Sequence, residues 1–247
     1  MTSILMVLPI YFREEDTNTC LDSLGKTDIQ GLSLSIVLAV NGSTDKQRVQ
    51  MEERVSSRGL IPGASSKIMM FPGNPGKGVS VNRVVEEESK SHKFDFILSL
   101  DSDMVVTDSS WLIDLLSDFQ IASKSHRLGA LACDQSGQCC HVPDSPVTYT
   151  YNDRIFVGSR ENQGQAGGCL LIKAEVWYLL KGYRAFRVYG SDDGHLMADL
   201  NAKGWVCLID KGVSLYHPFQ KDMAYCDWKK RACIDALTDN EKGGYYK

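Results

Sequence analysis

Short, nearly continuous apolar runs alternate with longer polar segments along the first hundred residues of the chain. The apolar runs have the length of strands that are buried on both faces, and they cover residues 4–10, 34–40, 67–71 and 94–100. The polar segments carry turn or capping residues near their ends, and they predict helices at residues 14–26, 41–59 and 76–90. Strand and helix in this order predict right-handed βαβ units and a mainly parallel sheet.

The pattern is less regular beyond residue 103, although strand and helix signals continue. Helices are predicted at residues 109–125, 174–182 and 191–204, and short strands at residues 128–133, 167–173, 205–210 and 213–217. Residues 134–165 place aromatic and β-branched patches in a polar loop, where regular layering is lost. In open α/β sheets, ligands bind at the carboxyl ends of parallel strands, so functional residues are sought where these strands end.

The composition of the 247 residues, 43% hydrophobic and 23% charged, is that of an ordinary soluble globular protein. A formal net charge of -4 argues against a broad basic footprint for nucleic acid. The basic cluster at residues 229–231 is interpreted as a solvated helix face, with phosphate contact as the alternative. No apolar stretch approaches the ~20 residues that span a bilayer, and the first residues lack the features of a signal peptide. We therefore expect a soluble cytoplasmic protein.

The cysteines are scattered along the chain, without the dense framework of a small secreted scaffold, so most of them are expected to be reduced. One cluster brings metal-ligating atoms together in the sequence, at Cys133, Cys139, Cys140 and His141. Its adjacent cysteines do not match the usual C-x2-C zinc spacing, and a loop with free thiols is the favoured interpretation.

The segment "LDSDM" places two carboxylates directly after a predicted buried strand. In an extended chain Asp101 and Asp103 point to the same side, while Ser102 points away. Two like charges held together cost energy unless a cation lies between or near them. Carboxylate oxygens favour Mg²⁺ or Mn²⁺, which usually complete their coordination with substrate phosphates and water. The segment therefore predicts half of a metal–diphosphate site.

The sequence resembles the GT-A fold glycosyltransferases of family 2, which are inverting enzymes that use nucleotide sugars, from residue 5 to residue 217. The segments that carry the resemblance are "VLPIYFREEDTNTCLDSL", "VLAVNGSTD", "NPGKGVSVN", "LSLDSDM", "GGCLLIKAEVWYLLKGY", "YGSDDGHLMADLNAKGW" and "VSLYHP". Two positions depart from the family pattern. Phe12 stands where Asn is common, and Val40 and Asn41 leave out the acid that often reads the edge of uracil.

The resemblance implies a single GT-A domain over residues 1–219, with a Rossmann-like, mainly parallel sheet flanked by helices and a smaller antiparallel portion on the acceptor side. Residues 1–108 would form the nucleotide-sugar-binding half and residues 109–219 the acceptor-binding half. Residues 220–247 are predicted to form an amphipathic helical tail that covers the active site, touches a membrane surface or pairs with a second subunit in a homodimer.

The resemblance also implies a set of metal ligands. Asp103 is the first choice for direct ligation, and Asp101 would reach the ribose, or the metal through water. His217 would be a further ligand, and its nitrogen favours Mn²⁺ over Mg²⁺. The alternative for His217 is a strand-terminal histidine that is hydrogen-bonded to the backbone.

For the reaction itself, the resemblance places Asp193 at the catalytic base and Asp192 at the preceding acidic position, on the acceptor side. The dipole and amides of a helix N-terminus would keep the base ionised. The alternative is that both residues only cap the helix, together with Ser191. The role of His195 is left open. Gly167 and Gly168 would let an acceptor hydroxyl come close.

The nucleotide is expected to lie against Pro9 and Tyr11, with Asn41 and Asp101 as further contacts. Asn41 both donates and accepts hydrogen bonds, which fits uracil without excluding other bases; a plain turn residue is its alternative. Lys77 lies between two glycines at a strand-to-helix turn, where it would approach a phosphate or the base.

The predicted function is transfer of a hexosyl or related group from a nucleotide sugar, a UDP-sugar in the first instance, to an acceptor hydroxyl with Mn²⁺ or Mg²⁺. The acceptor would be a glycan, a lipid-linked sugar or another hydroxyl compound, and modified nucleic acid is less favoured. Two alternatives stay open. One is a non-catalytic nucleotide- or sugar-binding module. The other is a sugar-phosphate nucleotidyltransferase, although "PIYFREED" lacks the Gly-rich basic loop of that class.

Overall fold

The structure is a computed structural model of the chain. It describes residues 1–11, 13–42, 44–137, 146–159, 168–185, 192–218 and 231. The strands are β1 (Thr2–Ile10), β2 (Leu32–Asn41), β3 (Ser65–Phe71), β4 (Phe96–Leu100), β5 (Leu128–Ser136), β6 (Pro146–Tyr151), β7 (Arg154–Ser159), β8 (Cys169–Lys173) and β9 (Val206–Tyr216). The helices are α1 (Glu14–Leu24), α2 (Asp45–Arg58), α3 (Lys77–Glu88), α4 (Trp111–Ser123), α5 (Ala174–Leu180) and α6 (Asp192–Ala202).

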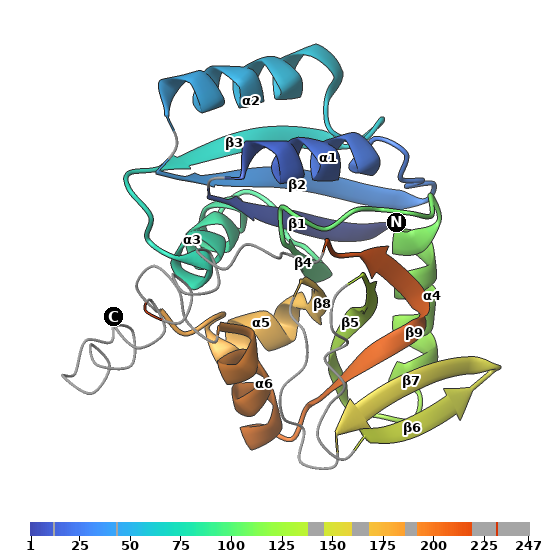
Figure 1. The fold of residues 1–247 in the computed structure, drawn as a ribbon. Coiled ribbons are helices and arrows are strands. Elements are labelled where there is room, and N and C mark those ends of the chain that lie inside the picture. The colour runs from blue at the N-terminus through green and yellow to red at the C-terminus, as the bar shows by residue number, and fades with distance from the viewer. Residues whose placement is uncertain are drawn as a thin grey trace.

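The strands form one sheet in the order β3-β2-β1-β4-β8-β5-β9-β7-β6 (Figure 1). The first four strands in this order are parallel, as the alternation of apolar runs and helices predicts. From β8 onward the sheet is mostly antiparallel, and β5 with β9 is the parallel exception. The predicted fold class, an α/β sheet with a smaller antiparallel portion, is confirmed.

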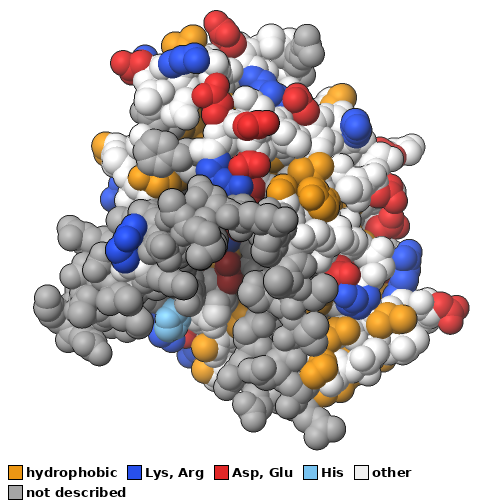
Figure 2. Space-filling model, in the orientation of Figure 1, with side chains coloured by type: hydrophobic (Ala, Val, Ile, Leu, Met, Phe, Trp, Pro, Cys, Tyr) orange, Lys and Arg blue, Asp and Glu red, His pale blue; other side chains and the backbone are white. Residues whose placement is uncertain are grey.

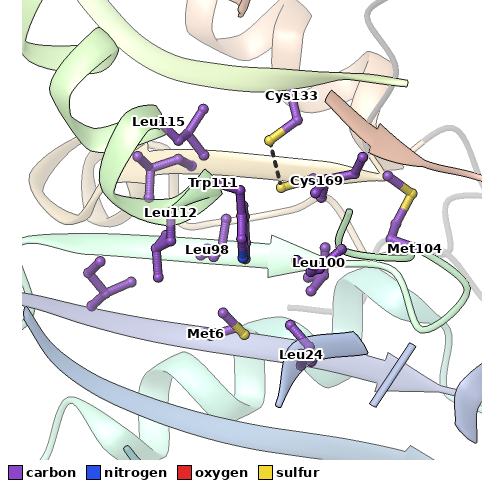
Figure 3. Packing of buried hydrophobic residues seen from close by; sticks show 14 of the residues in the cluster. Met6, Leu24, Leu98, Leu100, Met104, Trp111, Leu112, Leu115, Cys133 and Cys169 are labelled. Atoms are coloured by element: carbon purple, nitrogen blue, oxygen red, sulfur yellow. Dashed lines mark hydrogen bonds between the residues drawn. The ribbon is translucent and has the colours of Figure 1, made fainter. Parts of the chain in front are cut away.

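The sheet is buried on both faces by helices. On one face α1 and α4 share a hydrophobic cluster with β1, β2, β4, β5 and β9, and α4 contacts β5 and β9. On the other face α3, α5 and α6 cover the sheet. Figure 3 shows Met6, Leu98 and Leu100 of the sheet facing Trp111 and Leu112 of α4. The indole nitrogen of the buried Trp111 donates to the Thr27 hydroxyl at 3.0 Å, which satisfies its polar atom inside the core.

The four described cysteines, Cys20, Cys133, Cys169 and Cys207, are buried free thiols. This agrees with the expectation of reduced cysteines. The Sγ atoms of Cys133 and Cys169 lie 3.2 Å apart between β5 and β8, as the dashed line in Figure 3 shows. Of the predicted loop cluster, Cys133 lies in the buried strand β5 and not in a loop, and Cys139, Cys140 and His141 lie outside the described residues.

Two segments differ from the sequence prediction. A hairpin, β6 and β7, occupies part of the stretch that was expected to lack regular layering. Its two-residue turn has positive φ at Asn152 and Asp153 (48° and 61°), a conformation that these two residue types tolerate. The alternating Thr-Tyr-Thr-Tyr before the turn is its sequence signal, which was too short to stand out in a long polar stretch.

The last strand is also different, because β9 is one continuous strand where two short strands were predicted. Consecutive residues Cys133 and Asp134 of β5 pair with Asp210 and Ser214 of β9, so the intervening residues form a bulge. The backbone N–H of Gly212 donates to Asp210 Oδ1 at 2.8 Å inside this bulge. The polar Lys211-Gly212 pair therefore marks an irregularity within a strand and not its end.

The described part of the chain contains no helix that is long and apolar enough to cross a membrane. The tail, residues 220–247, lies outside the described residues except for Arg231, so its predicted role stays a prediction. The division of residues 1–219 into a nucleotide half and an acceptor half also stays a prediction.

Candidate active site

The turn that follows β4 places the two aspartates of "LDSDM" at the carboxyl end of the parallel strands. The backbone N–H of Asp101 donates to the Gly168 carbonyl at 2.7 Å, and the N–H of Met104 donates to the Asp101 carbonyl at 3.1 Å. The segment is thus a tight turn, where an extended chain was expected. As a result the carboxylates of Asp101 and Asp103 engage different partners.

Asp103 lies between a histidine and an arginine. Its Oδ1 is 3.3 Å from His217 Nε2, and its Oδ2 accepts a hydrogen bond from Arg13 Nη1 at 2.5 Å. Burial alone would raise the pKa of Asp103, but the adjacent His217 and Arg13 outweigh it and hold the pKa at about 2. Asp103 is therefore an ionised, largely buried carboxylate.

Asp16 and Gln135 orient the two partners of Asp103, which are Arg13 and His217. Arg13 Nη2 is anchored by Asp16 Oδ2 at 2.5 Å, and the Arg13 backbone is left-handed (φ 62°, ψ 57°), which is uncommon for a non-glycine residue. On the other side, His217 Nδ1 lies 3.1 Å from Gln135 Oε1. The His217 ring therefore bonds to side chains, while its backbone N–H donates to the Ser136 carbonyl at 2.8 Å.

The geometry of Asp103 and His217 suits a divalent ion. Adjacent ligands around an octahedral Mg²⁺ with bonds of about 2.1 Å lie about 3 Å apart, and Asp103 Oδ1 and His217 Nε2 are 3.3 Å apart. Among the described residues no three His, Cys, Asp or Glu side chains come together as a complete ligand set. Asp103 and His217 are thus a pair of potential ligands, and not a complete set, within the described part of the chain.

A lysine connects Asp101 with the predicted base. Lys77 opens α3 after Gly76, whose φ of 91° suits glycine, and its Nζ lies 2.8 Å from Asp101 Oδ1. The same Nζ lies 3.2 and 3.3 Å from the two carboxylate oxygens of Asp193. Burial would lower the pKa of Lys77, but the two carboxylates raise it well above its usual value, so the ammonium is charged.

The pKa of the Asp101 carboxyl group is also raised, but here burial is the largest cause. Burial raises its pKa, Lys77 opposes this, and the charges of Asp193 and Asp103 add to the rise. Four ionisable groups therefore share one small region, and each sets the charge of its neighbours. A perturbed, interacting cluster of this kind at strand ends is typical of functional sites.

Asp192 and Asp193 begin α6, in the first turn where a helix stabilises negative charge. Asp192 is 5% exposed, and its Oδ1 has no hydrogen-bond partner among the described residues. It packs against α3, where a Cβ on Gly78 would lie 2.7 Å from Asp192 Oδ1. Burial, with a contribution from Asp193, raises the pKa of Asp192 to about 7. Only Asp193 of the two contacts the lysine.

The remaining predicted residues lie around this cluster. Asn41 ends β2 and is 2% exposed; its Nδ2 donates to Ser80 Oγ at 3.3 Å, and its Oδ1 has no partner among the described residues. Pro9 and Tyr11 lie at the carboxyl end of β1, next to β2 and β4. A Cβ on Gly168 would meet Gln135 Nε2 at 2.8 Å, so this position has no room for a side chain.

Some predicted residues lie outside the described part of the chain, namely Gly167, Phe12 and Ser191. Tyr183, at the end of one of the segments that carry the resemblance, is 2% exposed and packs edge-on against Trp177 in the core. Sequence reasoning missed Arg13 and Gln135. Arg13 lies in the first segment that carries the resemblance but was given no role there, and Gln135 lies in none of the segments. Their partners Asp103 and His217 are 90 and 82 residues away along the chain.

The face seen in Figure 2 has acidic and basic side chains interspersed around α1 and α2. This agrees with the small net charge of -4.

No protein-family model matches the sequence, and no curated protein matches it either. Solved structures do match in fold. A mannosyltransferase, PcManGT from Pyrobaculum calidifontis in complex with GDP-Man and Mn²⁺, matches with a TM-score of 0.66 and 15% identity over 95% of this chain and 61% of that one. S. aureus TarS matches with a TM-score of 0.61 and 18% identity over 91% of this chain and 38% of that one.

TarS residues 1-349 in complex with UDP-GlcNAc also match, with a TM-score of 0.60, 15% identity, and coverage of 90% of this chain and 59% of that one. The chain thus spans about three fifths or less of each of these structures. At such identities the likeness shows the fold alone, and it agrees with the predicted GT-A fold.

Proposed function

We propose that the protein is an inverting glycosyltransferase that moves a sugar from a nucleotide sugar, a UDP-sugar in the first instance, to an acceptor hydroxyl. The observation that carries the proposal is the arrangement at the strand ends. Asp103 and His217 form a pair of potential metal ligands, with 3.3 Å between Asp103 Oδ1 and His217 Nε2. Lys77 forms ion pairs with both Asp101 and Asp193. This combines a metal–diphosphate site with a carboxylate that can act as a base.

Asp103 and His217 would hold Mn²⁺ or Mg²⁺, and Asp101 would contact the ion through water or bind the ribose. When bound, the ion supplies stabilisation of the negative charge that develops on the leaving nucleoside diphosphate. Mn²⁺ is favoured because one of the two ligands is a nitrogen. That PcManGT, which has the same fold, was solved with Mn²⁺ and GDP-Man supports the use of a divalent ion.

Lys77 would bind the diphosphate. Its ammonium contacts Asp101 and Asp193, and donor phosphates carry more negative charge than either carboxylate. Phosphate binding would therefore draw Lys77 from Asp193, which leaves that carboxylate to accept a proton. Asn41, whose buried Oδ1 has no partner among the described residues, would accept a hydrogen bond from the base edge, and Pro9 and Tyr11 would border the base.

Asp193 would act as the general base. As the acceptor oxygen forms its bond to the anomeric carbon, the hydroxyl proton moves to a carboxylate oxygen of Asp193. The bond between the anomeric carbon and the β-phosphate oxygen breaks, and its electron pair leaves with the nucleoside diphosphate. Attack opposite the leaving group inverts the anomeric configuration. Asp192 would support the acceptor side from behind the base, and Gly168, with Gly167, would leave room for the hydroxyl.

The test is release of nucleoside diphosphate from UDP- and GDP-sugars with Mn²⁺, with and without candidate acceptor glycans, lipid-linked sugars and other alcohols. We expect Asp193→Asn to lower turnover by roughly 100-fold or more, with donor affinity in calorimetry little changed. Asp103→Ala should abolish the Mn²⁺-dependent part of donor binding. Asp153→Asn is the matched control, since Asp153 is exposed in the β6–β7 turn and Asn tolerates its positive φ.

Three outcomes would contradict the proposal. A protein that binds a donor but turns over none of them with any acceptor would be a non-catalytic binding module. Donor binding that is unaffected by Asp103→Ala would refute the metal ligand. Formation of a nucleotide sugar from a nucleoside triphosphate and a sugar phosphate would instead identify a nucleotidyltransferase.

A further inference from the structure

Gln135 and His217 are placed side by side by the backbone. Gln135 is the penultimate residue of β5, and it pairs in register with Leu215 of the parallel strand β9. The backbone N–H of His217 donates to the carbonyl of Ser136 at 2.8 Å, which continues this pairing past the end of β9. The 3.1 Å contact between His217 Nδ1 and Gln135 Oε1 therefore rests on two rigid strands.

The contact decides which nitrogen of His217 carries the hydrogen. An amide oxygen only accepts, so Nδ1 must donate to Gln135 Oε1, and a neutral ring then has its lone pair on Nε2. That nitrogen lies 3.3 Å from Asp103 Oδ1, which is itself an acceptor. Two acceptors at this distance are favourable partners only when a cation or a proton lies between them.

The amide orientation has an alternative with the opposite consequence. If the Gln135 amide were reversed, its N–H would donate to Nδ1, and Nε2–H would donate to Asp103 without leaving a lone pair for a metal. In the observed orientation Gln135 Nε2 lies on the side of Gly168, where a Cβ would be 2.8 Å away, and it has no partner among the described residues. The nitrogen end thus faces the position next to the predicted acceptor glycine.

We propose that Gln135 is a positioning residue of the metal site, which fixes the His217 tautomer that presents its Nε2 lone pair beside Asp103. The inference rests on the metal pair of the proposed function. It adds a residue outside every segment that carries the sequence resemblance. Hydrogen-bonded partners of this kind orient metal-ligating histidines and commonly change metal affinity by about 10- to 100-fold when they are lost.

The first experiment measures Mn²⁺ affinity by electron paramagnetic resonance on the full chain, without a sugar donor. We expect Gln135→Leu, which removes the acceptor, to weaken Mn²⁺ binding by roughly 10-fold or more. Gln135→Glu keeps an acceptor oxygen at the same reach and should retain wild-type affinity or exceed it. Gln120→Leu, at an exposed position on α4, is the matched control and should bind as the wild type does.

A double-variant comparison separates positioning from general damage to the fold. If Gln135 acts through His217, Gln135→Leu should have little further effect on Mn²⁺ affinity in a His217→Ala background, because the two changes then remove the same interaction. Equal additional weakening in both backgrounds would overturn the inference, since it would show that Gln135 acts elsewhere.

The second experiment reads the tautomer directly, with saturating Mg²⁺, which is diamagnetic, and without donor. ¹⁵N-histidine NMR of the whole protein, with His217 assigned by His217→Gln, should show hydrogen on Nδ1 and none on Nε2 in the wild type, and a mixture of tautomers in Gln135→Leu. An Nε2–H tautomer in the wild type would overturn the inference and leave the proposed function standing. Absence of Mn²⁺ binding in the wild type, with and without UDP, would instead refute the metal pair, and with it both the inference and the metal-dependent part of the proposed function.

Discussion

Removal of the Lys77 ammonium should destabilise the folded protein measurably, because two carboxylates would then face each other. Lys77 Nζ lies 2.8 Å from Asp101 Oδ1 and 3.2 Å from Asp193 Oδ1. The two oxygens share one nitrogen at about 3 Å, so they lie within about 6 Å of one another. At an effective dielectric constant of ~20, like charges at that distance repel by about 3 kcal/mol.

We therefore expect Lys77→Met, which keeps the length of the side chain, to lower the free energy of unfolding by about 3 kcal/mol. For a chain of 247 residues this corresponds to a melting midpoint that is lower by roughly 6–12 °C, measurable by differential scanning calorimetry at neutral pH. Lys90→Met is the control. Its Nζ also contacts a carboxylate, Glu87 at 2.6 Å, but both side chains are more than half exposed, and the midpoint should not move.

A second change makes the reasoning refutable. Asp193→Asn in the Lys77→Met background removes one of the two facing charges, and it should restore most of the lost midpoint. If the double variant melts as low as Lys77→Met alone, repulsion between the carboxylates is not the cause. A midpoint for Lys77→Met that equals that of Lys90→Met would refute the electrostatic role of Lys77 altogether.

Two other changes probe the fold around the site. Burial raises the pKa of Asp210 to about 7, and the charge of the buried Asp118 contributes. This pKa is above the unfolded value of about 3.9, so the folded state loses stability as pH rises from about 4 to 7. In urea unfolding, Asp210→Asn should lose less free energy of unfolding between pH 4.5 and pH 7.5 than the wild type does. A loss equal to that of the wild type would contradict the raised pKa of Asp210. Gly78→Ala should lower stability by about 1–3 kcal/mol and weaken donor binding, because its Cβ would meet Asp192 Oδ1 at 2.7 Å and the Arg184 carbonyl at 2.8 Å. Gly212→Ala is the control, because its Cβ would meet only side-chain atoms, the nearest at 3.2 Å, and it should lower stability by less. Equal losses of stability in the two variants would argue against a clash at Gly78.

The part of the fold that sequence predicts well is the part that local pattern controls. Residues Thr2–Ile10 and Leu32–Asn41 are strands because their apolar runs are continuous, and the polar segments after them can only be helices or loops. The hairpin at Asn152 and Asp153 and the bulge in β9 were missed for a different reason. Each depends on pairing with a partner strand, which the local pattern does not record.

The residues of the site show the same distinction between what local sequence predicts and what depends on contacts between distant segments. Asp101 and Asp103 were located because they follow a buried strand, and strand ends meet at one edge of the sheet. The lysine between Asp101 and Asp193 was not foreseen, since Lys77 and Asp193 are 116 residues apart and each had been given a separate partner. The same holds for Arg13 on Asp103. Ion pairs between distant segments follow from the packed fold and from no motif.

The bulge in β9 determines which side of the sheet each following side chain faces. Alternate residues of a strand face opposite sides of the sheet, so one residue more or fewer between Asp210 and Ser214 would rotate the following side chains by half a turn. His217 would then point away from Asp103, although its sequence neighbourhood would look intact. This short stretch should therefore accept changes of residue type far more readily than any insertion or deletion.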